Sequence, residues 1–282
     1  MKLLATLHSP AKVNLGLWIT GRRNDGYHNL VTVFHRIVFH DTIKIRDGEK
    51  FAVKCSDCPD NEGNILFNVK QLFEKRFNVE INFCIEIFKE IPPGSGLGGA
   101  SSNAATFMKF LNEYFKLGLD RRELIKLGSK VGADVPFFLL EEDACIATGI
   151  GDILEPIDSN MNFPLYLYIP DVRIRTAWAY NKIDKLNLHI SHKEALEKAM
   201  RISRALQEND LEALYPLENT FEKVVFAEYP EIREAKENLY ILGAKVVSLS
   251  GSGSAVFGIF ERFLTIHGEK KLVESRLGGK VG

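Results

Sequence analysis

Two polar residues interrupt an apolar run near the start of the chain, in the segment PAKVNLGL at residues 10–17. Lys12 and Asn14 stand two positions apart, so on a β-strand their side chains face the same side, while Val13 and Leu15 face the other. An ammonium and a carboxamide among apolar neighbours predict a partly buried polar site, although a solvated strand face gives the same pattern. The segment is a first candidate for a reactive centre.

A second candidate is Asp134, in the segment GADVPFFLL at residues 132–140, where a polar stretch gives way to an apolar one. A carboxylate at such a place is partly desolvated, and it needs a cationic partner or it becomes protonated. Lys12 is available as that partner. The alternative is that Asp134 only caps the local backbone.

Glycine and serine are concentrated in IPPGSGLGGASSNAA, residues 91–105. The residues before it alternate apolar and polar over 81–88, which predicts a half-buried strand, and those after it repeat at helical spacing over about 102–117. A helix starts with backbone N–H groups that have no partner inside it, so an anion is the expected ligand at this connection. A flexible surface connection is the alternative.

Three familiar nucleotide-binding motifs do not fit the sequence around this glycine loop. GSGLGG at 94–99 satisfies G-x-G-x-x-G, but a dinucleotide fold needs an acid at the end of a second strand, and Asp120 instead stands between two predicted helices. No lysine follows the glycines as in a Walker A loop, and the H-R-D and D-F-G motifs of protein kinases are missing. The loop that remains can hold a polyphosphate with its amides and hydroxyls.

Two further segments indicate a function only when they are considered together with the others. SLSGSGSAVFG at 248–258 offers Gly251 and Gly253 for close backbone approach, and by itself it is more typical of an ordinary turn. Two such loops make a jointly held phosphate more plausible. In DGYH at 25–28, spacing alone does not decide between packing and ligand contact for Tyr27 and His28.

The elements that must position these residues mix strands and helices without strict alternation, which favours an α+β fold. We expect strands at 12–20, 30–46 and 51–55, then a helix over 65–77 capped by Asn64 or Asn61. A helix capped by Asp120 should end near Gly132, and VPFFLL should be core. A polar stretch over 149–164 predicts a boundary between domains 1–155 and 156–282. Beyond it we expect a strand at 164–170, three or four helices over 192–241, and paired strands at 244–249 and 255–260.

Composition limits the function classes. The 282 residues carry a net charge of −1 and are 45% hydrophobic, which is typical of a globular protein and gives no support for binding to nucleic acid or membrane surfaces. The apolar stretch before His8 is too short for a secretory signal, so we expect a cytoplasmic protein. Cys55 and Cys58 form a CSDC pair without the further ligands of a zinc site, so we favour neither a metal nor a redox role for them.

Together, PAKVNLGLWITGRRNDGYH, IPPGSGLGGASSNAA and SLSGSGSAVFG resemble the three signature motifs of the galactokinase–homoserine kinase–mevalonate kinase–phosphomevalonate kinase superfamily. AKVNLGL followed by GRRNDGYH, and GADVPFF followed by GIGDILEPI, look most like the branch that acts on 4-diphosphocytidyl-2-C-methyl-D-erythritol. This resemblance spans residues 10 to 258. It implies an N-terminal domain like the second domain of ribosomal protein S5, a ferredoxin-like C-terminal domain, and an active site in the cleft between them.

The resemblance also implies roles for individual residues. Asp134 would be the catalytic base and would also touch the substrate, with Lys12 as its charged neighbour and Asn14 at the methylerythritol end. Tyr27 and His28 would bind the cytosine, with a second stacking aromatic at Tyr180, and Thr176 would also contact the substrate. Trp178 is close enough to Tyr180 to be confused with it. Asn64 and Lys89 match positions near the adenine. The ATP phosphates would be held by the two glycine loops, at Pro92, Pro93, Gly94, Ser95, Gly96, Leu97, Gly98, Gly99, Ala100, Ser101, Ser102, Gly251, Ser252 and Gly253.

The implied reaction is phosphorylation of the substrate's 2-hydroxyl by ATP with Mg²⁺, in the methylerythritol phosphate route to isoprenoid precursors. The implied partner is a small molecule with a cytidine diphosphate group, with no nucleic acid, membrane or obligate protein partner. The alternatives are a sister kinase for homoserine or mevalonate, an NAD-dependent oxidoreductase, and a nucleotide-binding module without activity. The sequence does not fix the oligomeric state or the metal ligands.

Overall fold

The protein is described here by a computed structural model that covers residues 1–264 and 272–277. The strands of this part of the chain are β1 (Leu3–Arg22), β2 (His28–Asp47), β3 (Ala52–Cys55), β4 (Phe83–Phe88), β5 (Ala144–Thr148), β6 (Ile153–Ile157), β7 (Pro164–Tyr168), β8 (Val246–Leu249), β9 (Val256–Ile259) and β10 (Leu272–Arg276). The helices are α1 (Ile65–Phe77), α2 (Gly99–Tyr114), α3 (Arg121–Gly128), α4 (Val135–Leu139), α5 (Thr176–Lys185), α6 (His192–Glu208), a 3₁₀ turn η1 (Glu212–Leu214), α7 (Glu222–Glu228) and α8 (Pro230–Ile241).

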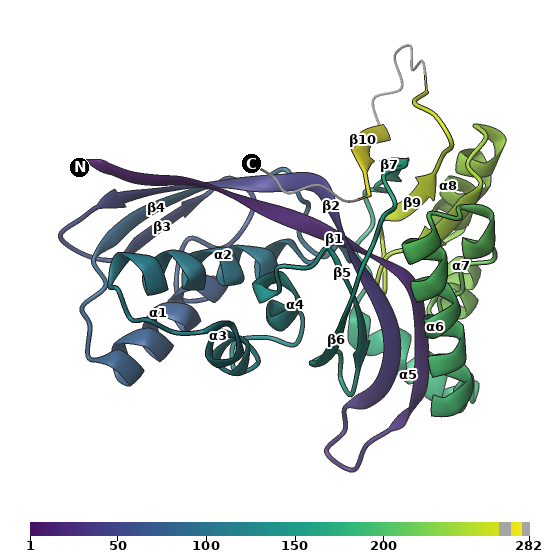
Figure 1. Cartoon of the computed structure of the whole chain (residues 1–282), viewed down its shortest axis with the longest axis horizontal. Coiled ribbons are helices and arrows are strands. Elements are labelled where there is room, and N and C mark those ends of the chain that lie inside the picture. The colour runs from purple at the N-terminus through teal and green to yellow at the C-terminus, as the bar shows by residue number, and fades with distance from the viewer. Residues whose placement is uncertain (265–271, 278–282) are drawn as a thin grey trace.

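A long antiparallel hairpin of β1 and β2 runs through both halves of the molecule (Figure 1). Each strand has 20 residues, and the pairing extends from Leu3 opposite Arg46 to Arg22 opposite His28. The tight connection over 23–27 places Tyr27 at its end, where the side chain of Asp25 accepts the Tyr27 N–H at 3.1 Å. The hairpin therefore carries Lys12, Asn14 and His28 on one continuous scaffold.

The first half of the molecule is a six-stranded sheet with the order β3-β4-β2-β5-β6, in which β1 pairs with β2. Helices α1 to α4 lie together on one face of this sheet (Figure 1). One hydrophobic cluster joins sheet and helices, with Ile43 and Ile85 from the sheet, Phe73 from α1, Phe107 from α2 and Phe137 from α4. The segment VPFFLL is buried throughout, as expected from its composition.

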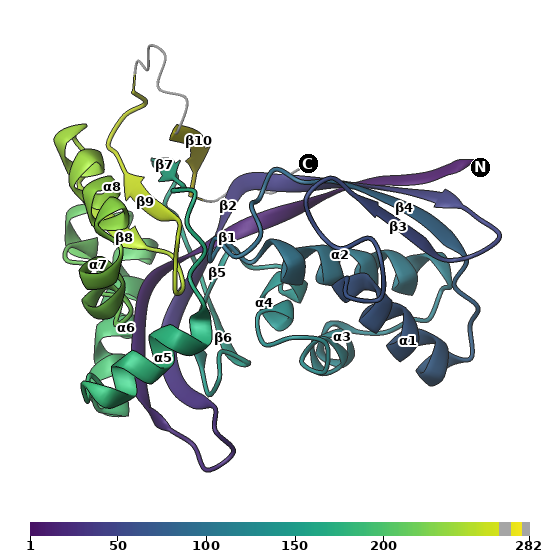
Figure 2. The same cartoon turned by 180° about the vertical axis from the view of Figure 1, so that it is seen from behind.

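The second half contains an antiparallel sheet with the order β10-β7-β9-β8. Its alternating side chains supply two cores: Leu165 and Phe257 pack with the hairpin and α6, whereas Tyr166 and Val247 pack with the α5, α7 and α8 side. Figure 2 shows α5 lying across the turn end of the hairpin. That crossing brings residues of α5 close to His28.

The expected boundary at residue 155 stays a prediction. Side chains from both sides of it share one hydrophobic cluster, in which Val13 and Trp18 of β1 meet Ile202 of α6 and Val246 of β8. The proposed second domain, 156–282, includes residues 265–271 and 278–282, which lie outside the described part of the chain. Strand β10 was not predicted from the sequence.

Local capping follows the sequence closely. The Asn64 side chain accepts the Leu66 N–H and so caps α1, one of the two expected residues. Asp120 forms a capping box with Glu123 at the start of α3. The second helix begins at Gly99, three residues before the expected start, so its first turn is part of the glycine loop.

The cysteines bring one correction. Cys55 and Cys58 form a disulfide, which the sequence analysis did not predict, whereas Cys84 and Cys145 are free thiols. Burial raises the pKa of the Cys145 thiol, so it stays protonated and inert. Separately, no helix within the described residues is both long and apolar enough to cross a membrane.

Candidate active site

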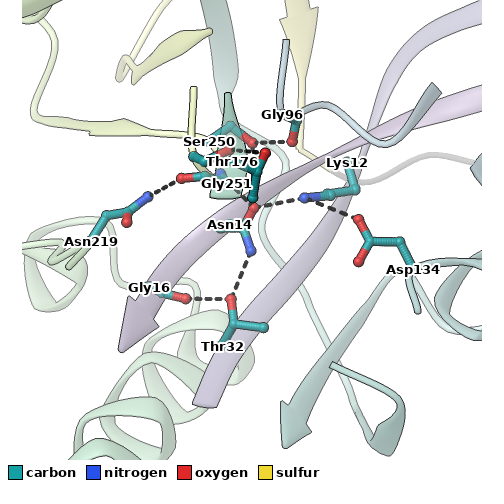
Figure 3. Close-up of polar contacts among 11 residues, drawn as sticks. Lys12, Asn14, Gly16, Thr32, Gly96, Asp134, Thr176, Asn219, Ser250 and Gly251 are labelled. Carbon is teal, nitrogen blue, oxygen red and sulfur yellow. Dashed lines mark hydrogen bonds and ion pairs between the residues drawn. The ribbon is translucent and has the colours of Figure 1, made fainter. Parts of the chain in front are cut away.

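Lys12 of β1 faces Asp134, the residue before α4 (Figure 3). The Lys12 Nζ lies 3.7 Å from Oδ2 of Asp134 and donates to Oδ1 of Asn14 at 2.8 Å. The lysine is buried and its Nζ also lies 4.9 Å from the centre of the Phe34 ring. Burial lowers the pKa of Lys12, and the nearby Asp134 raises it in part. The pairing expected from the sequence is therefore present in the structure.

The Asp134 carboxylate is turned away from its own helix. Asp134 precedes α4 as its N-cap residue, but its side chain makes no capping hydrogen bond, which leaves the carboxylate to face Lys12. Its side chain is 35% exposed, against 4% for Lys12. The lysine is thus fixed in the interior, and the carboxylate opens onto the cleft.

Asn14 links the strand to the second glycine loop. Its Oδ1 accepts the Gly251 N–H at 2.8 Å as well as the Lys12 ammonium, and its Nδ2 donates to Oγ1 of Thr32 at 2.8 Å. The Thr32 hydroxyl in turn donates to the Gly16 carbonyl at 2.6 Å (Figure 3). The amide oxygen and nitrogen of Asn14 each make hydrogen bonds, so Asn14 positions the loop and the lysine together.

The two glycine loops touch each other. The Ser250 hydroxyl donates to the Gly96 carbonyl at 3.0 Å, and the Ala255 N–H donates to the Ser95 carbonyl at 3.0 Å. A Cβ atom on Gly96 would lie 2.0 Å from the Ser250 carbonyl oxygen, and the φ of Gly96 is +82°. Only glycine fits there, for both conformation and space. The Lys12 N–H also donates to the Leu97 carbonyl at 3.0 Å, which ties the first loop to β1.

A cavity of about 320 Å³ lies on the outer side of the first loop. Its lining includes Asn64, Lys89 and the loop from Pro92 to Ser101. The first-turn N–H groups of α2 have no partner inside the helix and no side-chain cap from Gly98, so they are free to bind an anion. Two buried polar atoms here, Oγ of Ser95 and Oδ1 of Asn103, have no hydrogen-bond partner within the described chain. Unpaired donors and acceptors of this kind fit a polar ligand such as a nucleotide triphosphate.

Three residues assigned to the nucleotide point elsewhere with their side chains. Asn64 is occupied by the Leu66 N–H and the Pro59 carbonyl. Lys89 forms a buried ion pair with Asp41 and packs beside Gly99. The Ser102 hydroxyl accepts from that of Ser9 at 3.2 Å, and Ser102 does not line the cavity. The side chains of Asn64 and Lys89 shape the wall of the cavity. Contact of any of the three residues with a nucleotide stays a prediction.

A second cavity, of about 600 Å³, lies on the inner side of the first loop. It is lined by Lys12, Asn14 and Asp134 at one end and by Tyr27, His28 and Tyr180 at the other. Gly94, Gly96 and Gly98 border both cavities, so the first loop lies between the outer cavity and the Lys12–Asp134 pair. Thr176 and Ser252 close one side, with their hydroxyls 2.9 Å apart.

The aromatic end of this cavity identifies Tyr180 as the ring that faces the cleft. Its ring lies 4.4 Å from that of His28, with an angle of 17° between the planes. Trp178 instead packs against Tyr229 and does not line the cavity. Tyr27 is 62% exposed at the mouth. Burial, and secondarily Asp134, raises the pKa of Tyr180 to about 12, so its hydroxyl stays neutral.

Sequence reasoning missed several residues that hold the site in place. Asn219 donates to the carbonyls of Leu249 and Gly251 at 2.8 and 2.9 Å and so supports the second loop. Asp184 accepts from His28, as described below. Neither residue stands in a glycine-rich or otherwise distinctive segment, so only their position in the folded chain reveals them.

Residues 64–142 match the family of GHMP kinases N terminal domain, and residues 193–265 match that of GHMP kinases C terminal. A Chlorobium phaeobacteroides protein named 4-diphosphocytidyl-2-C-methyl-D-erythritol kinase is 39% identical over 259 residues, 91% of this chain and 86% of the relative. A Persephonella marina protein of the same name is 40% identical over 256 residues, 90% of each chain.

Solved structures agree. A crystal structure of 4-(cytidine 5′-diphospho)-2C-methyl-D-erythritol kinase superimposes with a TM-score of 0.79 and 28% identity, covering 98% of this chain and 100% of that one. A homoserine kinase from Cytophaga hutchinsonii gives a TM-score of 0.69 with 17% identity, over 91% and 84% of the two chains, and shares the fold. The α+β kinase fold expected from the sequence is confirmed.

Proposed function

We propose that this chain, which belongs to the 4-diphosphocytidyl-2-C-methyl-D-erythritol kinase family of the GHMP kinases, transfers the γ-phosphoryl group of ATP to the 2-hydroxyl of 4-diphosphocytidyl-2-C-methyl-D-erythritol. The reaction belongs to the methylerythritol phosphate route to isoprenoid precursors. The observation that carries the proposal is the pairing of Lys12 with Asp134. The pair lines a cavity that has the first glycine loop on one side and an aromatic cluster at its other end.

Asp134 is the proposed base. Its exposed carboxylate accepts the proton of the 2-hydroxyl as the hydroxyl oxygen bonds to the γ-phosphorus and the bond from that phosphorus to ADP breaks. The Lys12 ammonium, held by Asn14, keeps a positive charge beside the carboxylate and the reacting oxygen. The pair orients the nucleophile and favours its attack.

The first glycine loop supplies the electrostatic stabilisation. Phosphoryl transfer spreads negative charge over the oxygens of the moving group, so fixed donors at those oxygens lower the barrier. The free N–H groups at the start of α2, together with its dipole, are such donors. Contact with the second loop through Ser250 keeps the first loop in one conformation.

ATP and Mg²⁺ are the proposed cofactors. The cavity on the outer side of the loop, with its unpaired Ser95 hydroxyl, fits the nucleotide. Oxygen ligands suit Mg²⁺, and the hydroxyl of Ser101, a residue that lines the outer cavity, offers one. When bound, the ion would neutralise charge on the ATP phosphates.

The aromatic end of the inner cavity is the proposed cytosine subsite. The cluster of Tyr27, His28 and Tyr180 offers two stacking rings and one hydrogen-bonding edge. Homoserine and mevalonate have no aromatic base that could bind to it. This cluster favours a nucleotide-bearing substrate over the sister kinases. The named relatives at 36–40% identity support the same choice.

An ADP-release assay coupled to NADH oxidation tests the proposal. The purified chain is given ATP, Mg²⁺ and either 4-diphosphocytidyl-2-C-methyl-D-erythritol, homoserine or mevalonate. We expect ADP release with the first compound alone, and phosphorus NMR of the product should show a new phosphate ester at the 2-position. Release with homoserine or mevalonate instead, or with none of the three, would contradict the proposal.

A further inference from the structure

A partly buried acid on α5, Asp184, contacts His28 from outside the cleft. Oδ1 of Asp184 lies 2.8 Å from Nε2 of His28 and 3.1 Å from Nε2 of His189. Oδ2 of the same carboxylate lies 3.5 Å from Nη1 of Arg22. Burial raises the pKa of the Asp184 carboxyl, but the hydrogen bonds from His28 and His189 and the charge of Arg22 outweigh it and bring the pKa below its usual value. Asp184 is therefore an ionised acceptor.

This contact determines which nitrogen of His28 carries the proton. A carboxylate can only accept hydrogen bonds, so the Nε2 that faces Asp184 must be the protonated one. In neutral imidazole the other nitrogen, Nδ1, is then a lone-pair acceptor. Among the described residues Nδ1 has no hydrogen-bond partner, and His28 lines the inner cavity.

The orientation of the His28 ring suits a nucleobase that lies in the same plane as the ring. A hydrogen bond to an imidazole nitrogen is made at the edge of the ring, so a base bound to Nδ1 lies close to the His28 plane. Tyr180 is within 17° of parallel to that plane, and therefore the same tyrosine can stack on both rings. Stacking would bind any pyrimidine, and the edge contact alone distinguishes one from another.

We propose that Asp184 is a specificity-determining positioning residue, which holds His28 in the Nε2–H tautomer so that its Nδ1 accepts the exocyclic amino group of cytosine and repels the carbonyl oxygen of uracil. This inference rests on the proposed function, because it takes the aromatic subsite to be the base subsite. Asp184 touches His28 and does not line the cavity, so it acts through the histidine.

Binding of CDP and UDP tests the inference without turnover. Calorimetric titrations are made with a saturating non-hydrolysable ATP analogue, so that neither nucleotide occupies the ATP cavity. We expect the native protein to bind CDP about tenfold or more tightly than UDP. This is the effect expected when the hydrogen bond from the cytosine amino group to Nδ1 is replaced by the uracil oxygen facing the same acceptor. In Asp184→Ala the preference should fall to about threefold or less, because the histidine is free to take either tautomer.

The second readout is the tautomer itself. Long-range ¹H–¹⁵N spectra of the histidine rings should show Nε2–H for His28 in the native protein and a mixture in Asp184→Ala. Lys182→Ala is the matched control, since Lys182 is a half-exposed residue of the same helix that pairs with Glu228. It should keep both the native preference and the native tautomer.

Three results would overturn the inference: an Nδ1–H tautomer in the native protein, an unchanged nucleotide preference in a folded Asp184→Ala, or equal weakening of CDP and UDP, which marks a merely structural role. If Asp184→Ala fails to fold, Asp184→Leu takes its place, because leucine also lacks an acceptor for the Nε2–H of His28. A native preference together with a native tautomer in that variant would likewise overturn the inference. Failure of the proposed function is seen separately, as absence of ADP release by the native protein.

Discussion

The Lys12 ammonium lies 3.7 Å from the Asp134 carboxylate, and the two groups differ in exposure, at 4% and 35% of their side chains. The difference decides their parts in the reaction. A buried, hydrogen-bonded ammonium stays where the fold puts it, whereas the exposed carboxylate can meet a substrate hydroxyl.

Lys12→Met should lower the activity without lowering the stability of the fold. Burial lowers the pKa of Lys12 in the folded protein below its usual value of 10.5. The buried charge therefore costs folding free energy as long as Lys12 is protonated in the folded state. This cost shrinks as the pH rises from the lowered pKa of the folded state towards 10.5. Methionine fills the space without the charge, and Asp134 remains solvated. We expect turnover to fall about a hundredfold or more, with an equal or higher melting temperature at pH 7.

The check is a thermal melt at pH 7 and at pH 9.5 beside the ADP-release assay. Native stability should approach that of Lys12→Met as the pH rises. A variant that unfolds much earlier than the native protein at pH 7 would show that the ammonium stabilises the fold, contrary to this account.

Gly96→Ala should disrupt the contact between the two loops. Its Cβ would lie 2.0 Å from the Ser250 carbonyl oxygen, so one loop must move. Gly94→Ala is the matched control, because Gly94 has a similar positive φ, +74°, but open space around its Cβ position. The control should lose about 1–2 kcal/mol of unfolding free energy from backbone conformation alone. Gly96→Ala should lose clearly more and should raise the KM for ATP by about tenfold or more.

Urea denaturation and ATP kinetics on the two glycine variants measure these differences. Equal losses of stability in both would mean that the loops can part freely. In that case the second loop does not hold the first in place.

Asn219→Asp should be worse than Asn219→Ala. The amide Nδ2 donates to two carbonyls of the second loop, and Oδ1 accepts the Phe221 N–H at 3.0 Å. Alanine loses these bonds, at a cost of about 1–3 kcal/mol. Aspartate keeps the acceptor but turns a buried carboxylate oxygen against two carbonyl oxygens, which adds repulsion. Chemical denaturation at pH 8 should rank native, alanine and aspartate in that order, and the reverse order of the two variants would refute this role.

Part of the site could be predicted from the sequence because it is local. Lys12 and Asn14 share a face of one strand, and the hydrogen bond between them confirms that period-two inference. The helix start could not be placed, since glycine is a poor helix former and the prediction therefore began at Ser102. In the fold, Gly99 packs closely on Ile91: a Cβ at residue 99 would lie 2.9 Å from the Ile91 side chain and would force it to shift.

The rest depends on contacts between distant segments. Asp41 is fully buried against Lys89 and the N–H groups of Glu90 and Ile91, yet its sequence neighbours resemble those of a surface strand. Asp184 reaches His28 only because α5 crosses the turn end of the hairpin (Figure 2). The length of β1 was also underestimated, since register shifts such as that between Asn14 and Gly16 interrupt its alternation.

Asp134→Asn tests the central claim most directly, because the change keeps the shape of the side chain and removes its ability to take a proton. Single-turnover phosphoryl transfer is measured with native and variant protein, together with titration of a non-hydrolysable ATP analogue. We expect the rate of transfer to fall by about two to four orders of magnitude while binding of the analogue changes by less than about threefold. Transfer at the native rate by a folded Asp134→Asn protein would contradict the role of the carboxylate beside Lys12.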